Sequence, residues 1–157
     1  MSKRVLFVCL GNICRSPTAE GIFRHLLEQR GIEAGRVEFD SAGTHGYHVG
    51  KGPDPRAAEA AMRRGISLAG IRARQLEPAD FQQFDLILCA DESNLHNVGE
   101  MRPAGARAEV RLLLEYASES PHREVPDPYY GGERGFEQVL DLVEEACEGL
   151  LEELLRP

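Results

Sequence analysis

The sequence predicts a three-layer α/β sandwich, in which helices cover both faces of a four-stranded, mainly parallel sheet. Short runs of apolar residues alternate along the chain with longer segments whose apolar residues recur at helical spacing. The short runs are apolar throughout, as expected for strands that are covered on both faces. Strands that alternate with helices in this way build mainly parallel sheets with a helix layer on each side.

The first half of the chain contains two predicted strands, a helix and a long loop. Residues 5–8 form the first apolar run, and the period becomes helical from Ser16 until Gly31, which follows the last predicted turn. A second strand is expected over 37–43. The stretch 43–54 is rich in Gly, His and Pro and predicts a loop, and loops of that length in a compact domain are usually functional.

The second half repeats the alternation. A helix is predicted over 55–64, with Gly65 in the stop position. A strand is predicted at the apolar run 85–89, and residues 107–113 can hold a fourth strand. Residues 91–94 offer N-caps for a helix between them.

The chain ends in a long predicted helix over 136–155, which follows a polar, turn-forming loop at 122–135. Its apolar residues keep helical spacing, so that its many glutamates face water. A length of 157 residues with 42% hydrophobic residues suits one domain, and we expect residues 1–157 to form it.

The composition excludes several classes of function. The formal net charge of −8, from 26 acidic and 18 basic residues, opposes general binding of nucleic acid or anionic membranes. No apolar stretch approaches the roughly 20 residues of a membrane span, and the start of the chain does not fit a secretory signal. We expect a cytoplasmic protein that is a monomer or a weak dimer, and any anion-binding site must be local.

The four cysteines indicate free thiols. They are sparse for a disulfide framework, and none of their spacings fits structural zinc, so we expect no metal and no organic cofactor. Cys89 ends an apolar strand and Cys147 lies on the core stripe of the last helix, which favours packing roles for both.

The segment between the first strand and the first helix carries the strongest chemical pattern. It runs from Cys9 to Pro17, and a turn at this place in an α/β sheet binds anions, because the helix N-terminus adds free N–H donors and partial positive charge. The residues between Cys9 and Arg15, relaxed by Gly11, can curl so that their amides converge on one tetrahedral anion. The segment is therefore a predicted phosphate-binding loop, comprising Leu10, Gly11, Asn12, Ile13, Cys14, Arg15 and Ser16.

Three side chains of this loop have predicted chemical roles. The amides, the helix end and the Arg15 guanidinium all favour a Cys9 thiolate, which is a nucleophile. The planar fork of Arg15 can hold two phosphoryl oxygens and the charge that develops on them. Ser16, at the expected helix N-cap, can donate a hydrogen bond to the Cys9 sulfur when it departs. A buried structural cysteine and a surface arginine would be the alternative, but the pattern stands at the one turn where the chemistry requires it.

The sequence resembles the low-molecular-weight protein tyrosine phosphatases over nearly its whole length. The resemblance begins with VCLGNICRSPTAE at 8–20 and continues in the ordered motifs SAG at 41–43, PDPR at 53–56, ARQL at 73–76, DESNL at 91–95 and DPYY at 127–130. It implies a phosphatase that hydrolyses phosphotyrosine in proteins, and small aryl phosphates, through a phosphocysteine intermediate. Phosphate-like oxyanions are expected inhibitors.

The resemblance also implies roles for residues outside the loop. It assigns Asp127 as the general acid that protonates the leaving phenolate and then activates water, a proton donor that the chemistry requires. Asn12 and Ser41 look like the polar pair that holds the loop in shape, and a left-handed turn at Asn12 is the structural alternative. Tyr47 and His48 on one wall, and Tyr129 and Tyr130 on the other, are expected to line the substrate cleft. Relatives often carry tryptophan and asparagine at 47 and 48, so peptide preference is open. A histidine is common in relatives at Arg64, to which we assign no role.

Cys14 adds a possible redox function. It lies on the same loop as Cys9, and a reactive thiolate beside a second thiol is the arrangement of a peroxide sensor. Packing in the loop is the alternative.

Two rival functions stay open from the sequence. Some arsenate reductases share this fold and anion loop, but they need a relay of further thiols, and no second cysteine follows Cys89 closely. A non-enzymatic phosphate-binding redox sensor is the other, although binding alone does not require Asp127.

Overall fold

The computed structural model describes residues 3–33, 35–129 and 132–156. Within these residues the chain forms one four-stranded sheet in the order β2-β1-β3-β4, and each neighbouring pair is parallel. The strands are β1 (Lys3–Cys9), β2 (Val37–Gly43), β3 (Leu86–Cys89) and β4 (Glu109–Leu112). The expected four-stranded sheet is confirmed.

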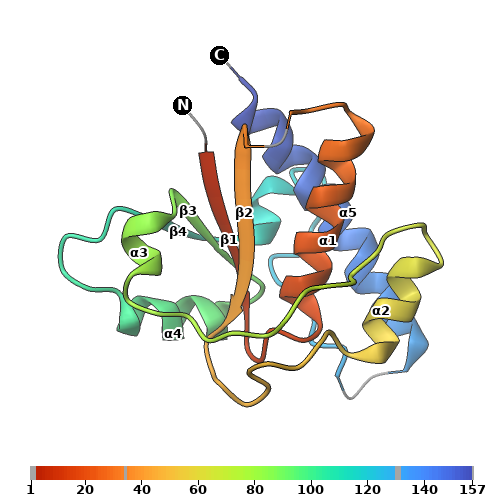
Figure 1. The fold of residues 1–157 in the computed structure, drawn as a ribbon, viewed down its shortest axis with the longest axis horizontal. Helices are drawn as coiled ribbons and strands as arrows, with labels where there is room; N and C mark the ends of the chain where they lie inside the picture. Colours follow the sequence, from red (N-terminus) through yellow and green to blue (C-terminus); the bar gives the residue numbers. More distant parts are fainter. Residues whose placement is uncertain (1–2, 34, 130–131, 157) are drawn as a thin grey trace.

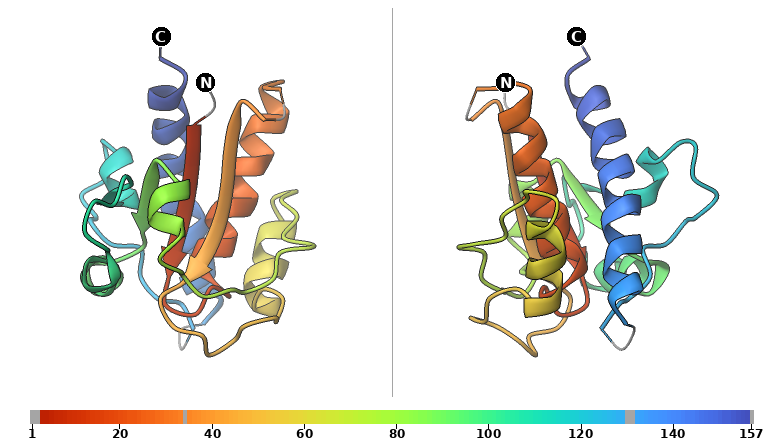
Figure 2. Two further views of the ribbon diagram at one scale, coloured as in Figure 1. Left: turned by 60° about the vertical axis from the view of Figure 1, so that its left-hand side comes forward. Right: turned by 90° about the vertical axis from the view of Figure 1, so that its right-hand side faces the viewer.

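The helices form a layer on each face of the sheet. They are α1 (Arg15–Gln29), α2 (Pro55–Met62), α3 (Asp80–Gln83), α4 (Glu92–Met101), the 3-10 helix η1 (Leu113–Tyr116) and α5 (Glu133–Leu154). Figure 1 shows α1 and α5 on one side of the strands and α3 and α4 on the other, and Figure 2 confirms this from two further directions. Helix α2 packs beside α5 and α1.

Each face of the sheet buries its own apolar cluster. Residues of β1 alternate between the clusters, with Phe7 packed toward α1 and α5 and Leu6 packed toward α3 and α4. Both side chains are at most 1% exposed. This double coverage explains why the first strand is apolar throughout.

The strand order places a crevice at the end of β1. The chain moves from β1 to β2 on one side, whereas β3 lies on the other side of β1. Ligands of open α/β sheets bind where the direction of strand addition reverses, beyond the carboxyl ends of the strands. The Cys9–Ser16 loop starts at this point.

Most predicted elements agree with the structure, with differences at their ends. Helix α5 begins at Glu133, before the expected residue 136, and α2 ends at Met62. The short helices α3 and η1 were not predicted, because elements of one turn leave little periodicity in a sequence. The expected N-cap at Ser16 is wrong: α1 starts at Arg15, Cys14 is the N-cap residue, and no side chain caps this end. In the described part of the chain, no helix combines the length and apolar character needed to cross a bilayer.

Candidate active site

A cleft of about 340 Å³ opens at the carboxyl end of β1. It is lined by Cys9, Leu10, Gly11, Ile13, Cys14, Arg15, Tyr47, His48, Asp127 and Tyr129. The structure therefore brings together most of the side chains that sequence analysis singled out. Asn12 and Ser16 of the loop, and Ser41 of β2, are buried polar residues that do not line the cleft. Tyr130, the remaining cleft residue expected, lies outside the described residues.

Cys9 lines the cleft, and two hydrogen-bonding groups of Ser16 lie beside its sulfur. The Ser16 N–H donates to Cys9 Sγ at 3.4 Å, and the Ser16 hydroxyl oxygen lies 3.0 Å from the same sulfur. The side chain is only 3% exposed but contributes to the lining of the cleft. The expected contact between Ser16 and Cys9 is present, and the serine makes it from inside the first turn of α1.

Hydrogen bonds from neighbouring segments to three main-chain carbonyl groups hold the backbone of the loop in place. The Cys9 and Leu10 carbonyls accept hydrogen bonds from Thr44 and His45, and the Ile13 carbonyl accepts one from Asp54 at 2.8 Å. In a trans peptide the C=O and the following N–H point in opposite directions. The N–H groups that follow these carbonyls therefore point away from the supporting loops, so that they are available to an anion.

Gly43 allows the second strand to come close to this loop. A Cβ at Gly43 would lie 2.8 Å from the Leu10 carbonyl oxygen and 3.1 Å from the Asn12 nitrogen. Any larger residue would displace the loop, which gives the SAG motif a physical reason.

Asn12 holds the loop from within. Among the described residues it is the non-glycine residue with positive φ, 57°. Its Oδ1 accepts from the Arg74 main-chain N–H at 3.0 Å, and its Nδ2 donates to Ser16 Oγ at 2.8 Å and Ser41 Oγ at 3.0 Å. Both readings of Asn12 from the sequence, the left-handed turn and the polar partner of Ser41, agree with this geometry.

These contacts determine the direction of the hydrogen bonds. The Arg74 main-chain N–H can only donate, so it must face Asn12 Oδ1 and leave both amide hydrogens for the two serines. Because Ser16 Oγ accepts from Asn12, its own hydrogen can point either at the Cys9 sulfur, 3.0 Å away, or at the Ala42 carbonyl oxygen, 3.5 Å away, and the sulfur is the closer acceptor. The network thus prepares Ser16 to donate to a thiolate.

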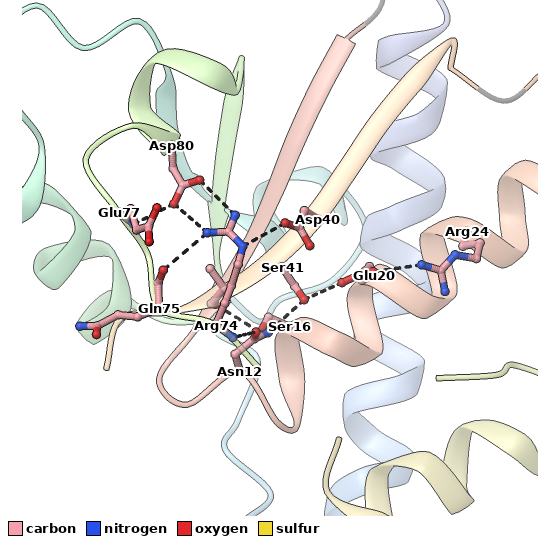
Figure 3. Close-up of polar contacts among 11 residues, drawn as sticks. Asn12, Ser16, Glu20, Arg24, Asp40, Ser41, Arg74, Gln75, Glu77 and Asp80 are labelled. Carbon is pink, nitrogen blue, oxygen red and sulfur yellow. Dashed lines mark hydrogen bonds and ion pairs between the residues drawn. The ribbon is translucent and has the colours of Figure 1, made fainter. Parts of the chain in front are cut away.

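The network continues into α1 through a carboxylate (Figure 3). Ser41 Oγ donates to Glu20 Oε1 at 2.6 Å, and Arg24 Nη2 donates to Glu20 Oε2 at 3.0 Å. Burial raises the pKa of Glu20, and the contacts with Ser41 and Arg24 only partly oppose this effect. Sequence analysis missed Glu20 because its spacing shows only that it belongs to the first helix.

Arg74 joins the loop to the opposite side of the sheet (Figure 3). While its main-chain N–H binds Asn12, its guanidinium contacts Asp40 Oδ2 at 3.0 Å and both carboxylate oxygens of Asp80 at 3.0 Å. The ARQL motif contributed to the family resemblance, but the sequence showed no partner for it.

The Arg15 side chain is held in place at the edge of the cleft. It is 4% exposed, and its Nη1 donates to Asp91 Oδ2 at 2.6 Å and to the Val125 carbonyl at 3.0 Å. Burial disfavours the charged guanidinium, but the Cys9 sulfur and the carboxylates of Asp91 and Asp127 outweigh it and raise the pKa of Arg15. The cation is therefore retained at every physiological pH.

Asp91 has two functions. It caps α4 as expected, by accepting from the Asn94 N–H at 2.7 Å, and its other oxygen binds Arg15. The second function was not visible in the sequence.

Asp127 lies across the cleft on the loop before α5. Its side chain is 43% exposed, and its Oδ2 lies 3.7 Å from Arg15 Nη2. Its Oδ1 accepts from the Tyr129 N–H at 3.0 Å, which fixes the carboxylate relative to its own loop. A carboxyl group here can reach an atom held between Cys9 and Arg15.

Aromatic rings form the outer walls. Tyr47 is 69% exposed and stacks on His45, with ring centroids 5.1 Å apart. The rings of His48 and Tyr129 approach to 6.4 Å. The rings suit a flat aromatic substrate.

The three other cysteine side chains are also buried, and burial favours the protonated form of their thiols. All four cysteines are free. Burial, followed by the nearby Asp54 carboxylate and the Cys9 sulfur, raises the pKa of Cys14 to about 12. Burial also raises the pKa of Cys89 to about 12, and that of Cys147 further. Cys89 and Cys147 belong to the two apolar clusters, in agreement with their expected packing roles.

Comparisons with known proteins agree with this geometry. Residues 4–157 match the model of the family described as low molecular weight phosphotyrosine protein phosphatase. The chain is 50% identical over 133 residues to the family member of Schizosaccharomyces pombe, covering 85% of each chain. A solved protein tyrosine phosphatase from Entamoeba histolytica, with Hepes in its active site, is 37% identical and superposes with a TM-score of 0.91, covering 98% of this chain and 97% of that one. YfkJ from Bacillus subtilis is 42% identical in its crystal structure, with a TM-score of 0.89 and coverage of 98% and 94%. The chain belongs to the low-molecular-weight phosphotyrosine protein phosphatase family.

Proposed function

We propose that the chain hydrolyses phosphotyrosine in proteins, and small aryl phosphates, with Cys9, Arg15 and Asp127 as its catalytic residues. The observation that supports this most is that all three residues line one cleft, where Asp127 Oδ2 lies 3.7 Å from Arg15 Nη2. The loop amides and Arg15 would hold the phosphate dianion, and the tyrosine ring would lie between the aromatic walls.

The reaction then proceeds in two steps. The Cys9 thiolate attacks phosphorus and the P–O bond to the phenol breaks, while Asp127 gives its proton to the departing oxygen. Asp127, now a carboxylate, takes a proton from water as that water attacks the phosphocysteine. The P–S bond breaks, and the Ser16 hydroxyl stabilises the released thiolate.

Substitution of Cys9 tests the nucleophile. Cys9→Ser should lose hydrolysis of p-nitrophenyl phosphate while it keeps binding inorganic phosphate, because the amides and Arg15 are unchanged. Vanadate should inhibit the wild type. Turnover near the wild-type rate in Cys9→Ser would exclude the nucleophile assignment. If the wild type binds inorganic phosphate but does not hydrolyse p-nitrophenyl phosphate, a non-enzymatic binder would be favoured.

Substitution of Asp127 tests the acid. Asp127→Ala should slow phenyl phosphate by roughly 10²-fold or more, but p-nitrophenyl phosphate far less, because only a poor leaving group depends on protonation. Asp141→Ala, which removes an exposed aspartate of α5, is the matched control. An equal loss on both esters would contradict the acid role.

The remaining features are also proposals. We propose that the whole chain acts as one cytoplasmic domain that does not bind nucleic acid or membranes, and the free thiols fit a reducing compartment. Arsenate reduction is not favoured, since the related proteins are phosphatases. In addition, burial raises the pKa of Cys89, which disfavours the thiolate that a thiol relay would need. In the described part of the chain, no group of three or more His, Cys, Asp or Glu side chains could hold a metal ion.

Redox regulation is proposed through Cys9 and Cys14, which line the same cleft. Peroxide would oxidise the Cys9 thiolate to a sulfenic acid, and the Cys14 thiol would displace water to form a disulfide. Because its raised pKa keeps Cys14 protonated, this second step should be slow at neutral pH. Mass spectrometry that finds only irreversible Cys9 oxidation after mild peroxide would reject the switch.

A further inference from the structure

Arg56, in the first turn of α2, touches the loop that carries Asp127. Its Nη2 donates to the Tyr129 carbonyl at 2.8 Å, and its guanidinium lies 5.5 Å from the centre of the Tyr129 ring. The same guanidinium lies 5.0 Å from the Phe136 ring in α5. Arg56 therefore contacts both the loop and the helix that follows it.

The other partner of Arg56 is bound to the phosphate-binding loop. Arg56 Nε and Nη2 form a fork on the two carboxylate oxygens of Asp54, at 3.1 and 3.0 Å. The Asp54 main-chain N–H in turn donates to the Ile13 carbonyl at 2.8 Å. The Asp54 side chain is 7% exposed, so the fork is anchored on a buried group.

Tyr129 connects Arg56 to Asp127. The Tyr129 N–H donates to Asp127 Oδ1 at 3.0 Å, while the carbonyl of the same residue accepts from Arg56. A continuous path thus runs from Ile13 through Asp54, Arg56 and Tyr129 to Asp127. Each link is a hydrogen bond of 3.1 Å or less.

We propose that Arg56 is a positioning residue, which fixes the distance between the general acid and the phosphate-binding loop. The inference rests on the proposed role of Asp127. The acid sits on an exposed loop, and proton transfer requires it within hydrogen-bond reach of the leaving oxygen. A shift of about 1 Å in such a group can slow a reaction 10²-fold. Arg15 and Ala90 hold the loop at Val125, and Arg56 adds a restraint at Tyr129, two residues after the acid.

The arginine fork is essential to this role. One guanidinium binds two oxygens of Asp54, a carbonyl and two aromatic rings at once, whereas the single ammonium of lysine cannot match that geometry. Arg56→Lys should therefore behave nearly like Arg56→Ala. If Arg56 merely attracted the phosphate by its charge, lysine would restore the activity.

The kinetic test compares two leaving groups. We expect Arg56→Ala to lower kcat for phenyl phosphate by roughly tenfold or more, but kcat for p-nitrophenyl phosphate by less than about threefold. Inhibition by inorganic phosphate should change little. The selective loss should disappear in an Asp127→Ala background, because no acid is then left to misplace.

Arg63→Ala is the matched control. Arg63 lies on the end of the same helix, is 48% exposed against 49% for Arg56, and also pairs with acidic side chains. It contacts neither loop in the described structure, so its removal should leave the leaving-group dependence unchanged. Equal losses on both esters in Arg56→Ala, or rescue by lysine, would overturn the proposal.

Hydrogen exchange separates this inference from the proposed function. Amides of residues 122–129 should exchange faster in Arg56→Ala and Arg56→Lys than in wild type or Arg63→Ala. Unchanged exchange would refute the positioning role whatever the catalytic result. If exchange is faster in the Arg56 variants but Asp127→Ala slows both esters equally, Arg56 still restrains the loop and Asp127 is not the general acid.

Discussion

Asn12 combines an unfavourable backbone conformation with a side chain whose hydrogen-bonding groups are all in use. Its φ of 57° lies in the left-handed region, and its amide binds Arg74, Ser16 and Ser41. Left-handed backbone costs about 1–2 kcal/mol in ordinary residues, and asparagine tolerates it better than most. The position therefore demands both a permissive backbone and an amide.

Two substitutions at Asn12 separate these demands. Asn12→Gly should lower the free energy of unfolding by about 1–3 kcal/mol, because Ser16, Ser41 and the Arg74 N–H lose a buried partner. Asn12→Ala should lower it by a further ~1 kcal/mol, since alanine adds backbone strain that glycine avoids. Urea denaturation measures both, and kcat should fall in each variant. A glycine variant less stable than the alanine variant would contradict the account.

The residues that could be read from the sequence are those whose chemistry is local. The spacing of Cys9, Arg15 and Ser16 at one strand-to-helix turn was sufficient to predict a phosphate-binding loop. Glu20 and Arg74 were missed because key partners lie far away in the chain, at Ser41 for Glu20 and at Asp40 and Asn12 for Arg74. Arg74 acts on the loop through a main-chain N–H, a group that every residue except proline has, so its identity could not reveal that contact.

At the scale of elements, helix ends show where catalytic and structural demands compete. Asp91 both caps α4 and binds Arg15, since its two oxygens can serve different partners. Ser16 cannot cap α1, because its hydroxyl is committed to Asn12 and the Cys9 sulfur. The strands were predicted close to their observed bounds, two of them from apolar runs. The N-cap of α1 was expected at Ser16, two residues after Cys14, for this reason.

Arg64 shows how a helix end is tied to its neighbour. Its guanidinium reaches Glu137, Asp141 and Glu144 on α5 at 2.8, 2.9 and 3.5 Å. These carboxylates raise the pKa of Arg64 against the effect of its burial. The position that is often histidine in relatives therefore joins α2 to α5 in this chain.

Two helical glycines should respond oppositely to alanine. A Cβ at Gly149 in α5 would clash with the Tyr116 carbonyl oxygen in η1, so the two helices must separate. Gly149→Ala should destabilise the protein by about 1–3 kcal/mol, as overpacked cores do. A Cβ at Gly99 in α4 meets nothing within 4 Å, and Gly99→Ala should stabilise by about 0.5–1 kcal/mol.

Thermal denaturation of the two alanine variants compares them directly. Gly149→Ala should melt below the wild type and Gly99→Ala slightly above it. A wild-type melting temperature for Gly149→Ala would show that α5 and η1 are not in close backbone contact.

At the scale of the whole molecule, an acidic protein concentrates its anion-binding groups at one point. The net charge is −8, so long-range electrostatics repel a phosphate dianion. Binding must come from short-range donors in residues 9–16. Four other parts of the chain hold these residues in place: the loop 43–54, the main chain at Arg74, and Asp91 and the Val125 carbonyl, which both bind Arg15. Folding of the whole chain and formation of the site are therefore linked.

This linkage predicts that phosphate or vanadate stabilises the folded protein through Arg15. A ligand at 100 times its dissociation constant adds about 2.7 kcal/mol to the free energy of unfolding, which raises the melting temperature of a chain of this size by roughly 5–10 °C. Arg15→Ala should abolish most of the increase, whereas Arg63→Ala should keep it. Sodium chloride at equal ionic strength controls for screening of the negative charge, which stabilises without any site. An equal increase with chloride, or in Arg15→Ala, would place the stabilising anion outside the cleft, because only a specifically bound dianion requires the buried guanidinium.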